Sequence, residues 1–292
     1  MGRPWIKSIP ERSEGVRSVL IGRALRHVTF TVGLGVTLVL LLTAALSLVY
    51  TPKDPLEMSI TGRLQGPSGS HPFGTDQFGR DLLSRVMTGA VTSILVGVIA
   101  VGIGMGLGVL LGVISGYFGG WLDEAFMRLM DAVQGFPAIL SALLISAVFR
   151  PSVGISMVAI GLAFLPVFAR LTRASFLELR DRDFVAAARA LGAGDATIIG
   201  RHIMPNTVSP LIVQATISFP VAILAEAALA YLGLGTQPPH PSWGLMLRES
   251  QAFLATNPWF AIFPGGAIAL TVLGLNLLGD GLRDLLDPKQ VG

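Results

Sequence analysis

Residues 28–50 contain no charged side chain, and this uninterrupted apolar run restricts the fold more than any other feature of the chain. As a helix, the run is long enough to cross roughly 30 Å of hydrocarbon. A cleaved signal peptide is the alternative, but the run exceeds a usual signal-peptide core. We therefore expect a retained first transmembrane helix.

Five further apolar blocks follow along the chain. Hydrophobic residues make up 52% of the sequence and charged residues 13%, whereas soluble domains average about 25% charged residues. The blocks are residues 90–115, 122–149, 155–171, 207–233 and 259–279. Pro137 is expected to kink the third of them. The sequence thus predicts an all-α integral membrane protein with six transmembrane helices.

The segments between these blocks carry the Lys and Arg residues unevenly. If both termini are cytoplasmic, 15 of the 21 Lys and Arg residues lie inside, in agreement with the positive-inside rule. We therefore expect a cytoplasmic tail, a first helix, an external loop, a membrane core with a cytoplasmic loop at 172–206, and a second cytoplasmic tail, at residues 1–27, 28–50, 51–89, 90–279 and 280–292. This topology accounts for the pI near 9.7 without nucleic acid binding.

Several kinds of chemistry are disfavoured by composition. The chain has no cysteine, and its four histidines share no short spacing, so we expect no metal site. None of the three lysines follows a glycine, which excludes a Walker A loop for ATP. Ser175 and His202 lie in one loop but in no recognisable catalytic motif. We expect no catalytic residue and no cofactor bound by this chain.

The segment of residues 181–206 is too rich in charge to lie inside a bilayer. Its apolar residues recur with the spacing of one helix face, and these residues are Phe184, Ala187, Ala188 and Leu191. The small side chains allow another protein to approach closely. A connector that packs only on its own domain is the alternative.

Local signals also predict the ends of two short helices in this segment. Asp183 is placed to cap the first helix, and Gly192 to end it with a left-handed residue. Asp195 is placed to cap the second helix, which Pro205 is expected to stop or kink. The segment is therefore expected to form two short helices at a bend.

The segment resembles the "EAA loop" of ABC-importer permeases, in which Glu-Ala-Ala precedes a Gly and a more distant Leu-Pro. The matching positions are Ala186-Ala187-Ala188, Gly192 and Met204-Pro205. Ala186 stands in place of the glutamate, whose role cannot carry over, and Met204 stands in place of the leucine. The resemblance implies that this loop docks into a groove of an ATPase subunit and transmits its movement.

Five other runs look like the peptide/nickel subfamily of these permeases. They are residues 71–90, 116–123, 228–235, 237–244 and 275–288. Their order and their sides fit the topology, so the chain looks like the second of two paired permeases in a di- or oligopeptide importer. An importer of nickel or another small solute has the same architecture and remains an alternative. A secondary transporter is a further one, although no clear internal repeat is present.

The resemblance implies a type I ABC importer permease fold, with residues 90–279 as the permease core, in the plasma (inner) membrane of a prokaryote. It implies a non-catalytic membrane subunit whose partners are a homologous permease in a heterodimer, two ATPases, an extracytoplasmic binding protein and membrane lipid. ATP and Mg²⁺ would be bound by the ATPases.

Four further features stand out, and all except the third are open to more than one interpretation. Glu226 is the ionisable residue of the fifth block and is a candidate for the translocation path or for a permease–permease interface. Gly104 and Gly108 belong to a GxxxG series that suits helix packing or, alternatively, a pore lining. Trp243 suits the headgroup region. A structured external loop is the interpretation of residues 51–89, and a ligand site from His71, Asp76 and Asp81 is the alternative.

Overall fold

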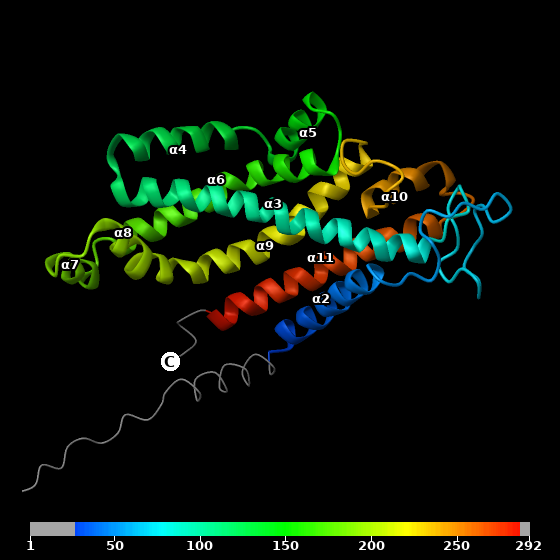
Figure 1. The fold of residues 1–292 in the computed structure, drawn as a ribbon, viewed down its shortest axis with the longest axis horizontal. Coiled ribbons are helices and arrows are strands. Elements are labelled where there is room, and N and C mark those ends of the chain that lie inside the picture. The colour runs from blue at the N-terminus through cyan, green and yellow to red at the C-terminus, as the bar shows by residue number, and fades with distance from the viewer. Residues whose placement is uncertain (1–26, 287–292) are drawn as a thin grey trace, which may run out of the picture.

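The computed structural model describes residues 27–286, in which the regular structure is helical apart from an isolated bridge between Thr75 and Asp81. In chain order the elements are α2 (Val28–Ser47), α3 (Leu82–Phe118), α4 (Gly120–Gln134), α5 (Ala138–Val148), α6 (Val153–Leu179), α7 (Asp183–Ala190), α8 (Asp195–Thr197), the π-helical turn η1 (Ile198–Ile203), α9 (Met204–Tyr231), α10 (Trp243–Ser250), the 3-10 turn η2 (Gln251–Phe253) and α11 (Trp259–Leu286). The long helices form an elongated bundle with α7 and α8 at one end and α10 at the other (Figure 1).

Five helices among the described residues are long and apolar enough to cross a membrane, and a bent pair makes a sixth if it counts as one span. The bent pair is α4 and α5, which meet at 83°. The predicted third span at 122–149 is therefore broken rather than mildly kinked. Pro137 lacks an N–H and disfavours helical backbone at Phe136, so the helix stops and restarts at Ala138.

Three spans extend beyond their predicted ends because polar residues continue the helices. The second begins at Leu82 rather than at residue 90, since the Asp81 carboxylate accepts a hydrogen bond from the Ser84 N–H at 2.9 Å and caps α3. The last continues to Leu286, past the predicted end at 279. The α6 helix likewise runs to Leu179 rather than ending near residue 171.

Glycines bring α3 and α6 into close contact. A Cβ atom added to Gly104 would lie 2.7 Å from the Phe164 Cβ, and one added to Gly108 would lie 2.6 Å from the Phe168 Cβ. The packing interpretation of this GxxxG series is confirmed, because backbone contact at this distance requires glycine. Gly102, on another face of α3, has open space around its Cβ position.

The segment of residues 234–258, between the fifth and sixth apolar blocks, is folded into a short helix and ordered turns. It contains α10, whose first residue, Trp243, is 2% exposed and donates its indole N–H to the Val86 oxygen at 2.9 Å. The headgroup assignment of Trp243 is therefore wrong. The side chain instead packs on α3 beside Gly89, whose missing side chain leaves room for the indole.

Candidate functional site

The segment of residues 181–206 forms a projection at the end of the bundle, beyond the ends of α3 and α6 (Figure 1). Helix α7 ends at Ala190, and Gly192 follows with φ of +85°, which confirms the left-handed residue expected there. The helix begins one residue earlier than the capping prediction requires. Arg182 occupies the N-cap without a side-chain cap bond, so the prediction that Asp183 caps the helix is wrong.

The second capping prediction fails in a similar way. Gly194 occupies the N-cap of α8, and Asp195 is the first helical residue. Pro205 lies in the first turn of α9 instead of ending a helix. The π-helical turn η1 directly precedes α9, so Pro205 follows a change of helix type rather than a helix end. The helical path from Asp195 to Tyr231 is therefore continuous.

The predicted apolar face of α7 is divided between the interior and the surface. Ala188 is buried together with Val185, a residue outside the face predicted from the sequence. Leu191 is 89% exposed and Phe184 42% exposed, and Ala187 is also exposed. The structure thus uses one side of α7 for its own packing and leaves a second apolar side exposed in the described part of the chain.

A small apolar core holds the projection to the bundle. Phe176 of α6 is fully buried against Val185, Ile198 and Ile203. Polar contacts add to it: the Tyr117 hydroxyl of α3 donates to the Asp195 carboxylate at 2.5 Å. The projection is therefore a packed extension of α3 and α6 rather than a loose connector. Sequence reasoning missed Tyr117, because it lies 78 residues from its partner.

Charged side chains also connect the neighbouring helix ends through an ion pair and a hydrogen bond. Arg173 of α6 makes a two-point contact with the Asp123 carboxylate of α4, at 2.5 and 2.6 Å. Arg180 donates to the Gly116 oxygen at 3.0 Å. These contacts join α4, α6 and α3 at the end of the bundle that carries the projection.

Glu226 of α9 is fully buried within the chain. Its Oε1 accepts a hydrogen bond from the Thr236 hydroxyl at 3.1 Å, and its Oε2 has no hydrogen-bond partner among the described residues. The side chain therefore faces the interior of this subunit, neither an open path nor an exposed surface. Its assignment to the translocation path or an interface stays a prediction.

At the opposite end of the bundle, a buried ionic cluster joins the 48–81 loop to α3 and α10. Asp76 lies 2.5 Å from Arg80 and 3.5 Å from Arg85, and Glu249 lies 3.1 Å from Arg85 and 3.3 Å from Arg80. Both arginines are at most 2% exposed. We name these four residues the ionic clamp.

The three residues considered for a ligand site have separate partners. Asp76 belongs to the ionic clamp, whereas His71 lies 2.9 Å from Asp81 and 3.0 Å from the Lys53 ammonium. Within residues 27–286, no group of three or more His, Asp or Glu side chains is placed to hold a metal ion. Asp76 therefore pairs with two arginines, whereas Asp81 pairs with His71 and caps α3.

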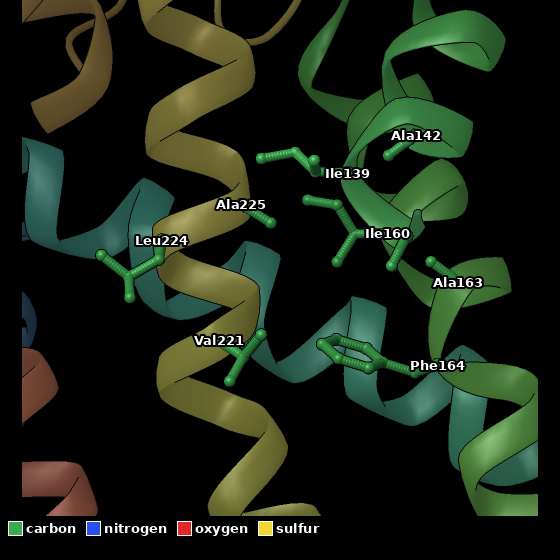
Figure 2. A pocket seen from close by; sticks show the side chains of 9 residues that line it. Ile139, Ala142, Ile160, Ala163, Phe164, Val221, Leu224 and Ala225 are labelled. Atoms are coloured by element: carbon green, nitrogen blue, oxygen red, sulfur yellow. The ribbon is translucent and has the colours of Figure 1, made fainter. Parts of the chain in front are cut away.

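Three cavities adjoin the long helices. The first, of about 210 Å³, is lined entirely by apolar side chains of α5, α6 and α9, with Ile139 and Ile160 facing Ala225 (Figure 2). The second, of about 450 Å³, lies between α3, the start of α6 and the 236–241 loop, and it has polar groups in its wall. The third, of about 520 Å³, is apolar and lies between α2, α3, α9 and α11.

Comparison with known proteins gives a consistent result. The profile of a family described as binding-protein-dependent transport system inner membrane component matches residues 108–292, more than half of the chain. A dipeptide transport system permease protein, DppC, of Alkalihalophilus pseudofirmus is 45% identical over 259 residues, covering 89% of this chain and 85% of the relative.

Two other relatives extend the comparison. A putative peptide transport system permease protein of Brucella abortus is 42% identical over 99% of this chain and 97% of its own length. The glutathione transport system permease protein GsiD of Shigella flexneri is 50% identical over 78% of this chain and 75% of its own length. A solved structure of the MetNI methionine ABC transporter, in an inward-facing conformation, shares the fold with a TM-score of 0.53, at 19% identity over 70% of this chain and 95% of that chain.

Proposed function

Because the chain belongs to the family of binding-protein-dependent transport system inner membrane components, we propose that it forms half of the translocation path of an ATP-driven importer of di- or oligopeptides. The peptide cargo is supported by the relatives, whose names specify dipeptide, peptide and glutathione transport. The chain itself is a permease subunit of an ABC importer and spans the membrane several times.

The proposed coupling of this subunit to an ATPase rests on the exposed apolar side of α7. Phe184 and Leu191 are exposed outside the membrane-spanning helices, beside Ala187 and the open space around Gly192. An apolar surface exposed to water favours a protein partner. We infer that an ATPase subunit covers this side. Ala188, on the buried side of α7, contributes by packing inside the subunit.

The partners follow from the same proposal. Two ATPase subunits bind ATP and Mg²⁺, a second permease completes the path, and an extracytoplasmic binding protein delivers the cargo. Both termini and the 181–206 segment lie in the cytoplasm of a bacterium, and the 48–81 loop and α10 face the binding protein. The positive-inside distribution of Lys and Arg supports this orientation.

Transport then proceeds by alternating access. Nucleotide binds one state of the ATPase pair more tightly than the other, which shifts the population of the permease states. Movement of the docked 181–206 segment reaches the membrane helices through Tyr117 and Asp195, and through the apolar core around Phe176. These contacts support a concerted movement of α3 and α6.

Affinity purification from native membranes followed by ATP-driven uptake in proteoliposomes tests this function. We expect a second permease and P-loop ATPases to co-purify, and tritiated dialanine to accumulate only with ATP and the binding protein. Accumulation of nickel in place of dialanine would move the assignment to the small-solute alternative. Uptake by this chain alone, without ATP, would contradict the importer assignment and favour a secondary transporter.

A further inference from the structure

The cavity of about 450 Å³ lies at the end of the bundle opposite the 181–206 segment, between α3, the start of α6 and the 236–241 loop. Four polar side chains in its wall donate hydrogen bonds to other groups of the protein. They are Thr88, Thr92, Thr236 and Gln237. Ser152 and His240 are further polar residues of the wall, and no Lys or Arg lines it. Whether these groups can still donate a hydrogen bond, or can only accept one, decides what kind of ligand the cavity can hold.

Three threonine hydroxyls use their protons within the protein. Thr88 donates to the Ser84 oxygen at 2.9 Å, and Thr92 donates to the Pro241 oxygen at 3.2 Å. Thr236 donates to Glu226 Oε1 at 3.1 Å. A hydroxyl has one proton and two acceptor lone pairs, so each of these oxygens can offer only lone pairs to a molecule in the cavity.

The amide protons of Gln237 are also used in hydrogen bonds within the protein. Its Nε2 donates to the Gly233 and Gly235 oxygens, each at 3.0 Å, which leaves the Oε1 acceptor for another partner. Ser152 is the exception, because its oxygen accepts from the Ile155 N–H at 3.3 Å and its proton remains for a ligand. His240 also lines the cavity, and its ring carries at least one N–H donor, so the wall presents mostly acceptors with Ser152 and His240 as donors.

A buried carboxyl group lies behind this wall. Glu226 is fully buried and its Oε2 lacks a hydrogen-bond partner in the described part of the chain, while Thr236 separates its other oxygen from the cavity. A cation bound at Thr236 would favour the ionised form of this buried carboxyl group, because the attraction between the two charges is strong in a medium of low dielectric constant. The polarised Thr236 hydroxyl then becomes a better acceptor.

We propose that this cavity binds the protonated amino terminus of a peptide cargo at the external end of the subunit. The ammonium group donates to the oxygens of Thr236 and neighbouring acceptors, and Ser152 donates to the first carbonyl oxygen of the peptide. The inference rests on the proposed peptide transport and assigns to this subunit a site for the cargo, with Glu226 acting through Thr236 as a positioning residue.

The absence of cysteine from the sequence allows a direct test in the assembled importer. Val153 lines the cavity, so Val153→Cys introduces a single thiol into this chain. Its reaction with cationic aminoethyl methanethiosulfonate and anionic sulfonatoethyl methanethiosulfonate is followed by mass spectrometry of the subunit in phosphatidylcholine liposomes. Ser70→Cys, in an exposed part of the 48–81 loop, is the matched control.

We expect the ratio of cationic to anionic reaction rates to be roughly tenfold higher at Val153→Cys than at Ser70→Cys. Adding Glu226→Gln or Thr236→Val should lower that ratio to the control value, whereas Thr236→Ser, which keeps the hydroxyl, should preserve it. Dialanine should slow the cationic reaction, and N-acetyl-dialanine at the same concentration should not, because it lacks the ammonium group.

Two results would overturn the inference. Equal rate ratios at the two thiols, in a complex that still accumulates dialanine with ATP, would remove the site and leave the proposed function intact. A high ratio that neither dialanine nor its acetylated form alters would show a cation-selective cavity that does not hold cargo. Failure of the parent importer to accumulate dialanine would instead count against the proposed function, and this arm does not use the thiol variants.

Discussion

The hydroxyl of Tyr117, in the last turn of α3, lies 2.5 Å from the carboxylate of Asp195 at the start of α8. This hydrogen bond joins a membrane-spanning helix to the projection that we propose docks on the ATPase. A hydrogen bond to a charged group is stronger than one between neutral groups. The pair is therefore placed to help carry movement of the projection into α3.

Replacing Tyr117 with Phe removes the hydroxyl and keeps the ring. We expect the number of cargo molecules transported per ATP hydrolysed to fall about threefold, because this bond is exposed to solvent, which reduces its contribution to roughly 0.5–1.5 kcal/mol. ATP hydrolysis by the complex should persist. The ratio is measured in proteoliposomes, with the exposed Tyr50→Phe as the control. An unchanged ratio in Tyr117→Phe would remove this contact from the coupling route.

Replacing Gly192 with Arg should prevent the ATPase from docking. No atom lies within 4 Å of the Cβ position, so the long side chain would extend into the surface that we assign to the partner. Gly192→Ala is the matched control, since both variants share the cost of about 1–2 kcal/mol for a left-handed non-glycine residue. Co-purification of the ATPase is the measurement. ATP-driven uptake retained in Gly192→Arg would contradict the docking assignment.

Replacing Gly108 with Ala should destabilise the subunit, whereas Gly106→Ala should not. The new methyl at Gly108 would lie 2.6 Å from the Phe168 Cβ and 2.8 Å from the Leu165 oxygen, but nothing lies within 4 Å at Gly106. Overpacking of this kind costs about 1–3 kcal/mol. Thermal unfolding of the purified complex in detergent compares the two variants. Equal midpoints would show that α3 and α6 separate readily.

Replacing Arg85 with Met should destabilise the external end of the bundle by about 3–5 kcal/mol, because one buried negative charge of the ionic clamp is then uncompensated. Arg63→Met, at an exposed position, is the matched control and should have little effect. The double variant Arg85→Met/Glu249→Gln restores the charge balance and should recover part of the loss in thermal unfolding. Absence of any recovery would argue that Arg85 acts through packing alone.

The sequence correctly predicted those features that depend on residues close together in the chain. The uncharged runs, the glycine series on α3 and the left-handed Gly192 were all predicted and are confirmed. It failed at helix starts, where a shift of one residue converts the expected caps Asp183 and Asp195 into first-turn residues. It also underestimated the break at Pro137, whose angle depends on how α4 and α5 pack on α6 and its neighbours.

The sequence by itself determined that this chain spans a membrane, because burying a charged residue in hydrocarbon is costly and the positions of the charges bound the spans. Only the tertiary structure decided which polar groups meet. Arg85 and Glu249 are 164 residues apart, and Tyr117 and Asp195 are 78 apart. Such pairs depend on how whole helices pack, and no local period of the sequence specifies that packing. The same holds for Trp243, whose burial depends on a contact with α3 rather than on its neighbours in the chain.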